Sequence, residues 1–122
     1  MEKSTSFQQL IVWQKAHQFV LLVYKTTDLF PQKEMFGLTS QFRRAAISIA
    51  ANIAEGYKKK DYKNKLNFFN IAQGSLEECK YYIILSKDLN YHSDSELETL
   101  SEEISKLLGA YIKSINANNS IS

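Results

Sequence analysis

Residues 94–116 read DSELETLSEEISKLLGAYIKSIN and form the most regular hydrophobic repeat of the chain. Apolar residues recur there every three or four positions, which places them on one face of an α-helix. Just ahead of the repeat, Ser93 and Glu96 have the spacing of a capping box. The repeat predicts an amphipathic helix over residues 94–116 with this buried stripe: Leu97, Leu100, Ile104, Leu107, Leu108, Tyr111 and Ile115.

Three further segments show helical spacing, and the turn formers are few. The chain has 122 residues, of which 4 are Gly and 1 is Pro, whereas sandwiches and barrels need many turns. Short connections between helices place successive helices side by side and antiparallel. We therefore predict an all-α fold, a single antiparallel up-down-up-down four-helix bundle. The predicted helices are 10–29, 38–57, 62–89 and 94–116, within one domain over residues 7–116, with flexible termini at 1–6 and 117–122.

Candidate capping residues stand at the predicted helix ends. The first helix ends near Pro31, because the residue before a proline is driven out of the helical region. Thr39 or Ser40 is the expected N-cap of the second helix, and Gly56 its expected left-handed C-cap. Asp61 is the expected N-cap of the third helix.

The sequence gives no pattern of a metal, cofactor or catalytic site. A di-iron bundle needs Glu-x-x-His pairs, but Gln14 and Leu89 stand three residues before His17 and His92. A single cysteine, Cys79, supplies neither a zinc motif nor an internal disulfide. We expect no cofactor, no metal and no enzymatic activity.

Hydropathy favours a cytoplasmic protein. Residues 1–9 are polar and lack the apolar region of a secretory signal. Apolar runs such as residues 20–23 are far shorter than the roughly 20 residues that a membrane-spanning helix needs. We expect a cytoplasmic location and no membrane partner.

Charge is unevenly distributed along the chain, although its net value is only +2. Residues 57–65 read YKKKDYKNK and contain five lysines and one aspartate, whereas residues 88–103 contain six acidic residues and no Lys or Arg. The bundle topology predicts that these blocks lie at opposite ends. The lysines suit phosphate groups, so they are the candidate nucleic-acid-binding residues, with a solubilising loop as the alternative: Lys58, Lys59, Lys60, Lys63 and Lys65.

A polar stripe runs along the second predicted helix. Its members are three or four residues apart and share one helix face. The stripe suits an interhelical or intersubunit hydrogen-bond network, with a solvated face or a ligand contact as alternatives. Its residues are Gln41, Arg44, Ser48, Asn52 and Glu55, and the candidate partners on the third helix are Ser75 and Glu78.

The first predicted helix is apolar around much of its circumference. Ile11, Phe19 and Leu22 widen the apolar face beyond the stripe through Ala16 and Val23. A helix with more than one apolar face is usually covered on more than one side. This surplus favours a homo-oligomer.

Several motifs together resemble the four-helix bundle proteins of the 23S rRNA intervening-sequence family. The resemblance covers roughly residues 7–115. The most specific part is a Q-x-x-R-A-A motif that begins at Gln41, followed by N-I-A-E-G that begins at Asn52. The remaining motifs are VWQKA at 12–16, FP at 30–31 with Glu34, GLTSQ at 37–41, and Ala72, Gly74, Ser75, Leu76 and Glu78.

The resemblance implies an up-down bundle that assembles as a homopentamer, and it carries over no catalytic residue. A similar bundle, the accessory protein of diversity-generating retroelements, binds nucleic acid and a reverse transcriptase. We therefore expect a non-enzymatic oligomer that binds RNA or DNA through the lysine-rich loop between the second and third helices. The alternative is a scaffold that recruits a partner protein without nucleic acid.

Overall fold

The computed structural model describes residues 6–121, with side chains over residues 6–118. Its longer helices are α1 (Ile11–Thr27), α2 (Leu38–Lys58), α3 (Tyr62–Asp88) and α4 (Glu96–Ile121), and two 3₁₀ turns are η1 (Phe7–Gln9) and η2 (Gln32–Glu34). Within the described range no residue is in a strand. None of these helices is long and apolar enough to cross a membrane.

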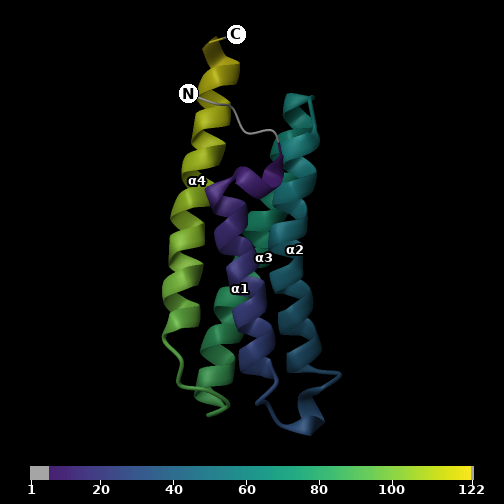
Figure 1. Cartoon of the computed structure of the whole chain (residues 1–122), viewed down its shortest axis with the longest axis vertical. Coiled ribbons are helices and arrows are strands. Elements are labelled where there is room, and N and C mark those ends of the chain that lie inside the picture. The colour runs from purple at the N-terminus through teal and green to yellow at the C-terminus, as the bar shows by residue number, and fades with distance from the viewer. Residues whose placement is uncertain (1–5, 122) are drawn as a thin grey trace.

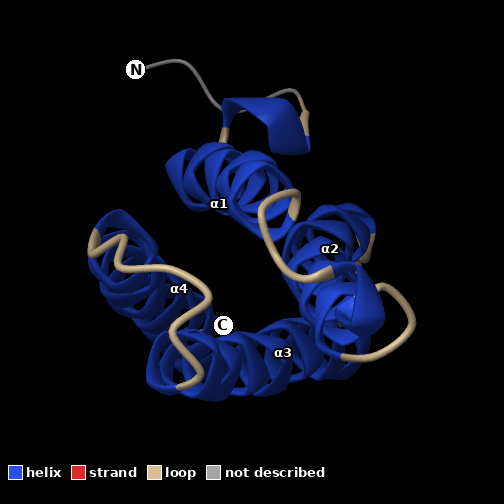
Figure 2. Cartoon of the chain, turned by 90° about the horizontal axis from the view of Figure 1, so that it is seen from below, coloured by secondary structure: helices blue, strands red, loops and turns tan. Residues whose placement is uncertain are grey.

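The long helices form an up-down-up-down bundle. Figure 1 shows the α1–α2 and α3–α4 connections at one end of the bundle and the α2–α3 turn at the other, so helices adjacent in sequence are antiparallel. Figure 2 shows α1 to α4 in order around a common centre, with η1 on the outside of α1. The predicted all-α bundle is confirmed.

The core is a single hydrophobic cluster to which every long helix contributes. Phe19 of α1, Phe42 of α2, Phe69 of α3 and Ile104 of α4 are all fully buried. Burying such side chains contributes roughly 1.5–3 kcal/mol each and is the main force that holds the helices together. The predicted helical stripes supply most of this cluster.

Gly56 lies inside α2 and allows α3 to approach closely, so its predicted role as a left-handed C-cap is wrong. A Cβ atom at Gly56 would lie 2.7 Å from Cε1 of Phe69 and 3.1 Å from Cβ of Phe68. The left-handed conformation occurs instead after α3, at Asn90, whose φ is 62°. There the Tyr91 N–H donates to the Ser86 carbonyl at 2.9 Å, as in a Schellman motif.

The start of α2 is capped from outside the helix, and the prediction of Thr39 or Ser40 as N-cap is wrong. The helix begins at Leu38, and the Leu38 N–H donates to Oε1 of Glu34 at 3.2 Å. Thr39 is buried against the core. The carboxylate of Glu34 also neutralises part of the positive end of the helix dipole.

Of the N-caps predicted for α3 and α4, the first is confirmed and the second is wrong. Oδ2 of Asp61 accepts the Asn64 N–H at 3.1 Å, so Asp61 is the N-cap of α3 as predicted. The Glu96 N–H donates to Oδ1 of Asp94 at 2.8 Å and not to Ser93, so the predicted capping box is absent. Asp94 is one residue nearer and carries a charge, which favours it next to a helix N-terminus.

Two helix ends differ from the predictions. Helix α1 ends at Thr27, earlier than predicted, because the chain tightens ahead of Pro31: the Leu29 and Phe30 N–H groups donate three residues back, to the Thr26 and Thr27 carbonyls, at 3.1 and 3.0 Å. Helix α4 continues to Ile121, past the predicted end at residue 116 and into the predicted flexible C-terminal segment. Residues 1–5 and 122 of the predicted flexible termini lie outside the described residues.

A hydrogen bond ties together the two connections at the end opposite the α2–α3 turn. The hydroxyl of Tyr91, in the α3–α4 connection, donates to Oε2 of Glu34 at 2.8 Å. This bond lowers the pKa of Glu34, and the Leu38 amide adds to the effect. The same bond raises the pKa of Tyr91. The aromatic rings of Phe30 and Tyr91 lie 5.2 Å apart beside it.

Replacing Gly56 with alanine should destabilise the bundle by about 1–2 kcal/mol, since overpacking against the buried ring of Phe69 outweighs the better helix propensity of alanine. Gly74→Ala is the matched control in α3, where the new Cβ meets no atom within 4 Å. The control should stabilise the protein by about 0.5–1 kcal/mol. Urea unfolding of both variants measures the difference, and equal shifts would contradict the close contact.

Replacing Tyr91 with phenylalanine should flatten the acid side of the stability profile. Because the folded pKa of Glu34 lies below its ordinary value of 4.5, its contribution is present above that pH and is lost as the pH falls through the folded pKa. Without the Tyr91 hydroxyl, the pKa of Glu34 should return toward 4.5. Thermal melts between about pH 6 and 3 measure this. Tyr81→Phe, which changes an exposed tyrosine, serves as the control. If the stability profile of Tyr91→Phe ran parallel to that of the unchanged protein, the link between Tyr91 and Glu34 would be refuted.

Candidate nucleic-acid interface

The lysine turn, residues 57–65, joins α2 to α3 at the end of the bundle where α4 finishes (Figure 1). The helices are separated by residues 59–61 alone, and the Lys59 N–H closes the end of α2 by donating to the Gly56 carbonyl at 3.2 Å. This short connection presents its side chains at a fixed place on the bundle.

Lys65 points back toward α2 and not toward solvent. Its Nζ donates to the carbonyls of Gly56 at 3.0 Å and Tyr57 at 2.8 Å. These carbonyls are among those that a helix C-terminus leaves without a helical partner. The ammonium also lies 5.6 Å from the ring centre of Tyr57 and 5.8 Å from that of Phe69. Lys65 therefore caps α2 from the next helix, and its burial lowers its pKa.

Lys59 is also engaged within the chain. Its Nζ lies 3.8 Å from Oε2 of Glu55 and 5.2 Å from the ring centre of Phe68. The ion pair is partly exposed and contributes little to stability. The Glu55 carboxylate nevertheless neutralises part of the positive charge that a phosphate would meet at Lys59.

The other lysines of the turn, Lys58, Lys60 and Lys63, are exposed. The structure therefore divides the predicted lysine cluster into a pair engaged within the chain, Lys59 and Lys65, and an exposed, outward set of three. The outward set offers the more accessible charge to a phosphate, since Lys59 shares its charge with Glu55.

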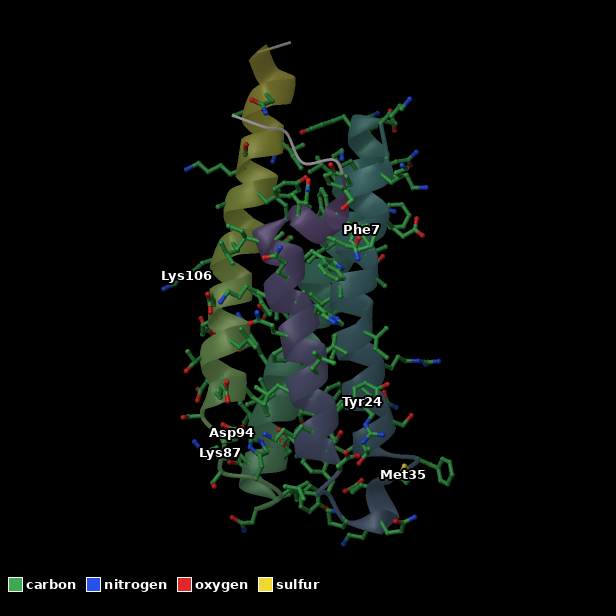
Figure 3. All side chains as sticks on the ribbon, in the orientation of Figure 1. Phe7, Tyr24, Met35, Lys87, Asp94 and Lys106 are labelled. Atoms are coloured by element: carbon green, nitrogen blue, oxygen red, sulfur yellow. The ribbon has the colours of Figure 1, made fainter. Side chains whose placement is uncertain are left out.

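The basic and acidic blocks lie at opposite ends, as predicted. Helix α4 begins at Glu96, at the end of the bundle away from the lysine turn (Figure 1). The acidic block is partly neutralised, because Glu103 pairs with Lys15 at 3.1 Å and Glu102 lies 3.7 Å from Lys80. Lys87, in the last turn of α3, also lies at this end (Figure 3). The positive charge at the lysine turn is thus more concentrated than the negative charge of the acidic block.

The tyrosines of the turn are held by neighbouring elements. The hydroxyl of Tyr62 donates to Oδ1 of Asn116, which joins the start of α3 to the last part of α4. The ring of Tyr57 faces the ammonium of Lys65. Both side chains are half-buried, so they stiffen the turn.

The polar stripe is a hydrogen-bond network at its centre and exposed at its ends. The Ser75 hydroxyl donates to the Ser48 hydroxyl at 2.7 Å, and Nδ2 of Asn52 donates to the same oxygen at 3.0 Å. Nδ2 of Asn52 also donates to the Ser48 carbonyl at 2.8 Å. Exposed members are Gln41, Arg44, Glu55 and, on α3, Glu78, whose carboxylate accepts the Tyr82 hydroxyl at 3.3 Å.

No group of three or more potential metal ligands occurs among the described residues. His17 is exposed and stacks on Trp13, with ring centres 5.1 Å apart. His92 shares a hydrogen bond of 2.8 Å with the Ser86 hydroxyl. Cys79 is buried in the core, and burial raises the pKa of its thiol, so it is not activated as a nucleophile.

Sequence reasoning missed an aromatic row that begins at Phe7, beside the lysine turn, and continues along α1. The rings of Phe7 and Trp13 meet edge to face at 5.0 Å, and Trp13 stacks on His17. Figure 3 shows Phe7 next to α2, near the end that carries the lysine turn. The aromatic residues at positions 7, 13 and 17 were the available signal, but the 3₁₀ turn that folds Phe7 back onto α1 was not predicted.

The sequence model of a family described as 23S rRNA-intervening sequence protein matches residues 8–113. The chain belongs to this family. No curated protein matches the chain. A similar solved structure is a protein of unknown function from the S23 ribosomal protein family of Bacteroides thetaiotaomicron, determined at 1.70 Å resolution. It is 28% identical, covers 84% of this chain and 96% of its own, and superposes with a TM-score of 0.74.

Replacing Lys65 with methionine should destabilise this family member by about 1 kcal/mol, because the partly exposed ammonium loses its bonds to the end of α2 while the apolar stem remains. Lys60→Met is the matched control, since Lys60 is exposed and should change stability by less than about 0.5 kcal/mol. Urea unfolding compares the two. Equal stabilities would show that Lys65 does not cap α2.

Proposed function

We propose that this protein is a cytoplasmic, non-enzymatic homo-oligomer that binds RNA or DNA through the outward lysines of the turn, Lys58, Lys60 and Lys63. The observation that carries the proposal is the division of the lysine turn. Lys65 and Lys59 hold the turn in place, and the remaining three ammonium groups project from one end of the bundle.

Such a turn suits phosphate groups and does not read sequence. Lysine offers a flexible point charge without the planar geometry that pairs with a base edge. Contacts with phosphates release counterions, so affinity should fall steeply as salt is added. The short connection and the Lys65 cap favour binding, because the backbone of the turn is ordered before the nucleic acid arrives.

Assembly would concentrate this charge. The family resemblance implies a homopentamer, in which five copies of the turn share one end. Exposed apolar side chains of the kind that subunit interfaces cover lie on α1, at Ile11 and Leu21, and on α3, at Tyr81 and Ile84.

The alternative function is a scaffold that recruits a partner protein. Its support lies at the end opposite the lysine turn, where Phe36 is 97% exposed and Leu29 is 81% exposed. An aromatic side chain that projects from a connection is a typical anchor for a pocket on a partner. A partner retained on the protein after nuclease treatment, and lost from Phe36→Ser, would favour this alternative.

Changing Lys58, Lys60 and Lys63 together to glutamate should weaken binding of a structured RNA by at least about tenfold. The slope of log affinity against log salt should also fall by about one unit for each lysine that touches a phosphate. Titrations followed by anisotropy at two salt concentrations measure both quantities. Solution mass, measured in parallel, tests whether the protein is a pentamer and whether the variant remains one.

The matched control changes Lys25, Lys33 and Lys87 to glutamate. These lysines are exposed, and they lie in the last turn of α1, in η2 and in the last turn of α3. The net charge changes by the same amount in both variants. Equal losses of affinity in the two variants would show that overall charge, and not the lysine turn, causes the effect. An unchanged affinity in the variant of Lys58, Lys60 and Lys63 would show that the lysine turn is not part of the interface.

A further inference from the structure

An apolar groove runs along α2, between α2 and η1 beside the lysine turn and between α2 and α1 farther along. Two adjoining hollows form it, of about 540 and 290 Å³, and both are lined by Phe7, Ala51 and Ala54. The aromatic row continues along one side through Trp13 and His17. Alanines on α2 leave the space that longer side chains would fill.

The groove and the lysine turn share a residue. Lys58 lines the larger hollow together with Tyr57, and its side chain is exposed. An ammonium therefore stands at the rim of a space whose walls are mainly aromatic and methyl groups. A ligand that fits both features has a negative charge joined to a flat apolar face.

We propose that this groove accepts an unpaired nucleobase while Lys58 and its neighbours hold the adjoining phosphates, so that the protein selects single-stranded nucleic acid over duplex. The inference rests on the proposed nucleic-acid function and adds the class of nucleic acid. In a duplex the base faces are stacked on one another and only phosphates and edges are available. In a single strand or a loop, a base can leave the stack and contact aromatic side chains.

The chemistry of the groove supports a base without sequence preference. Every base has an aromatic face, so stacking on Phe7 or Trp13 tolerates any sequence. Phe7, Ala51 and Ala54, which both hollows share, present no polar side-chain group to a base. Ser6 and Glu55 also line the larger hollow, and the Glu55 carboxylate lies 3.8 Å from the Lys59 ammonium. Charge complementarity comes from Lys58, Lys60 and Lys63, at the end of the bundle where the groove opens.

Trp13 provides the measurement, because it is the one tryptophan in the sequence and it lines the groove. A base that enters the groove should quench or shift its fluorescence, whereas phosphates held at the turn should not. The test titrates the full chain with an unstructured oligoadenylate and with an RNA duplex of equal length. Anisotropy of the labelled RNA gives the affinity, and Trp13 fluorescence reports on the groove.

Two variants alter the groove without removing a lysine. Phe7→Ala takes away a stacking surface, and Ala51→Leu fills the space from an exposed position of a helix, where leucine is well tolerated. Each variant should bind the single strand about tenfold more weakly and bind the duplex with unchanged affinity. Ile71→Ala is the control, since Ile71 is an exposed apolar residue of α3 that lines neither hollow. It should change neither affinity.

The outcomes separate this inference from the proposed function. The inference is supported if the protein prefers the single strand, if Trp13 fluorescence is quenched, and if both groove variants bind the single strand more weakly. Equal binding of both nucleic acids with Trp13 fluorescence unchanged overturns it and leaves the lysine turn as a phosphate site. Absence of all binding overturns both proposals. If Trp13 of the free protein is shielded from acrylamide and Ala51→Leu lowers the solution mass, a second copy covers the groove, and the inference is overturned.

Discussion

The close contact between α2 and α3 depends on small residues where large ones would separate the helices. At Gly56 the absent side chain makes room for the buried ring of Phe69. Farther along, Ser48 and Ser75 meet through their hydroxyls at 2.7 Å. Helices that approach closely bring their ends together, so residues 59–61 suffice to connect them. The position of the lysine turn follows from this contact.

The same contact decides what each lysine of the turn does. With the end of α2 held against the start of α3, the carbonyls of Gly56 and Tyr57 lie within reach of a side chain one turn into α3. Lys65 stands at that place and donates to both carbonyls. Lys58, Lys60 and Lys63 leave the helices in other directions and remain exposed. One run of lysines thus contains both a helix cap and a charged surface.

The opposite end of the bundle is closed by a different interaction. Glu34 accepts the first amide of α2 and the hydroxyl of Tyr91, so a single carboxylate joins the two connections there. This end carries the acidic block, but Lys15 and Lys80 neutralise part of it along α4. The charge that remains concentrated is basic and lies at the lysine turn. Phe7, the first residue of the aromatic row, lies beside it, and the row continues along α1 through Trp13 and His17.

Local signals predicted the helices and the fold, because hydrophobic periodicity and the scarcity of turn residues act along the chain itself. They also predicted the Asp61 cap, since its bond to Asn64 joins residues three apart. The signals failed where two side chains competed for one amide, as Asp94 and Ser93 do at Glu96. They failed again at Gly56, whose small size serves a neighbouring helix and not its own end.

The sequence by itself therefore determined a four-helix bundle with the lysine turn at one end and the start of the acidic block at the other. Only the tertiary structure decided which lysines face solvent, which polar residues of α2 meet α3, and that Phe7 folds back beside the turn. These depend on contacts between residues distant in sequence, such as Ser48 with Ser75 and Tyr91 with Glu34. A repeat of three or four residues specifies a helix face, but the neighbour of that face is fixed only when the helices pack.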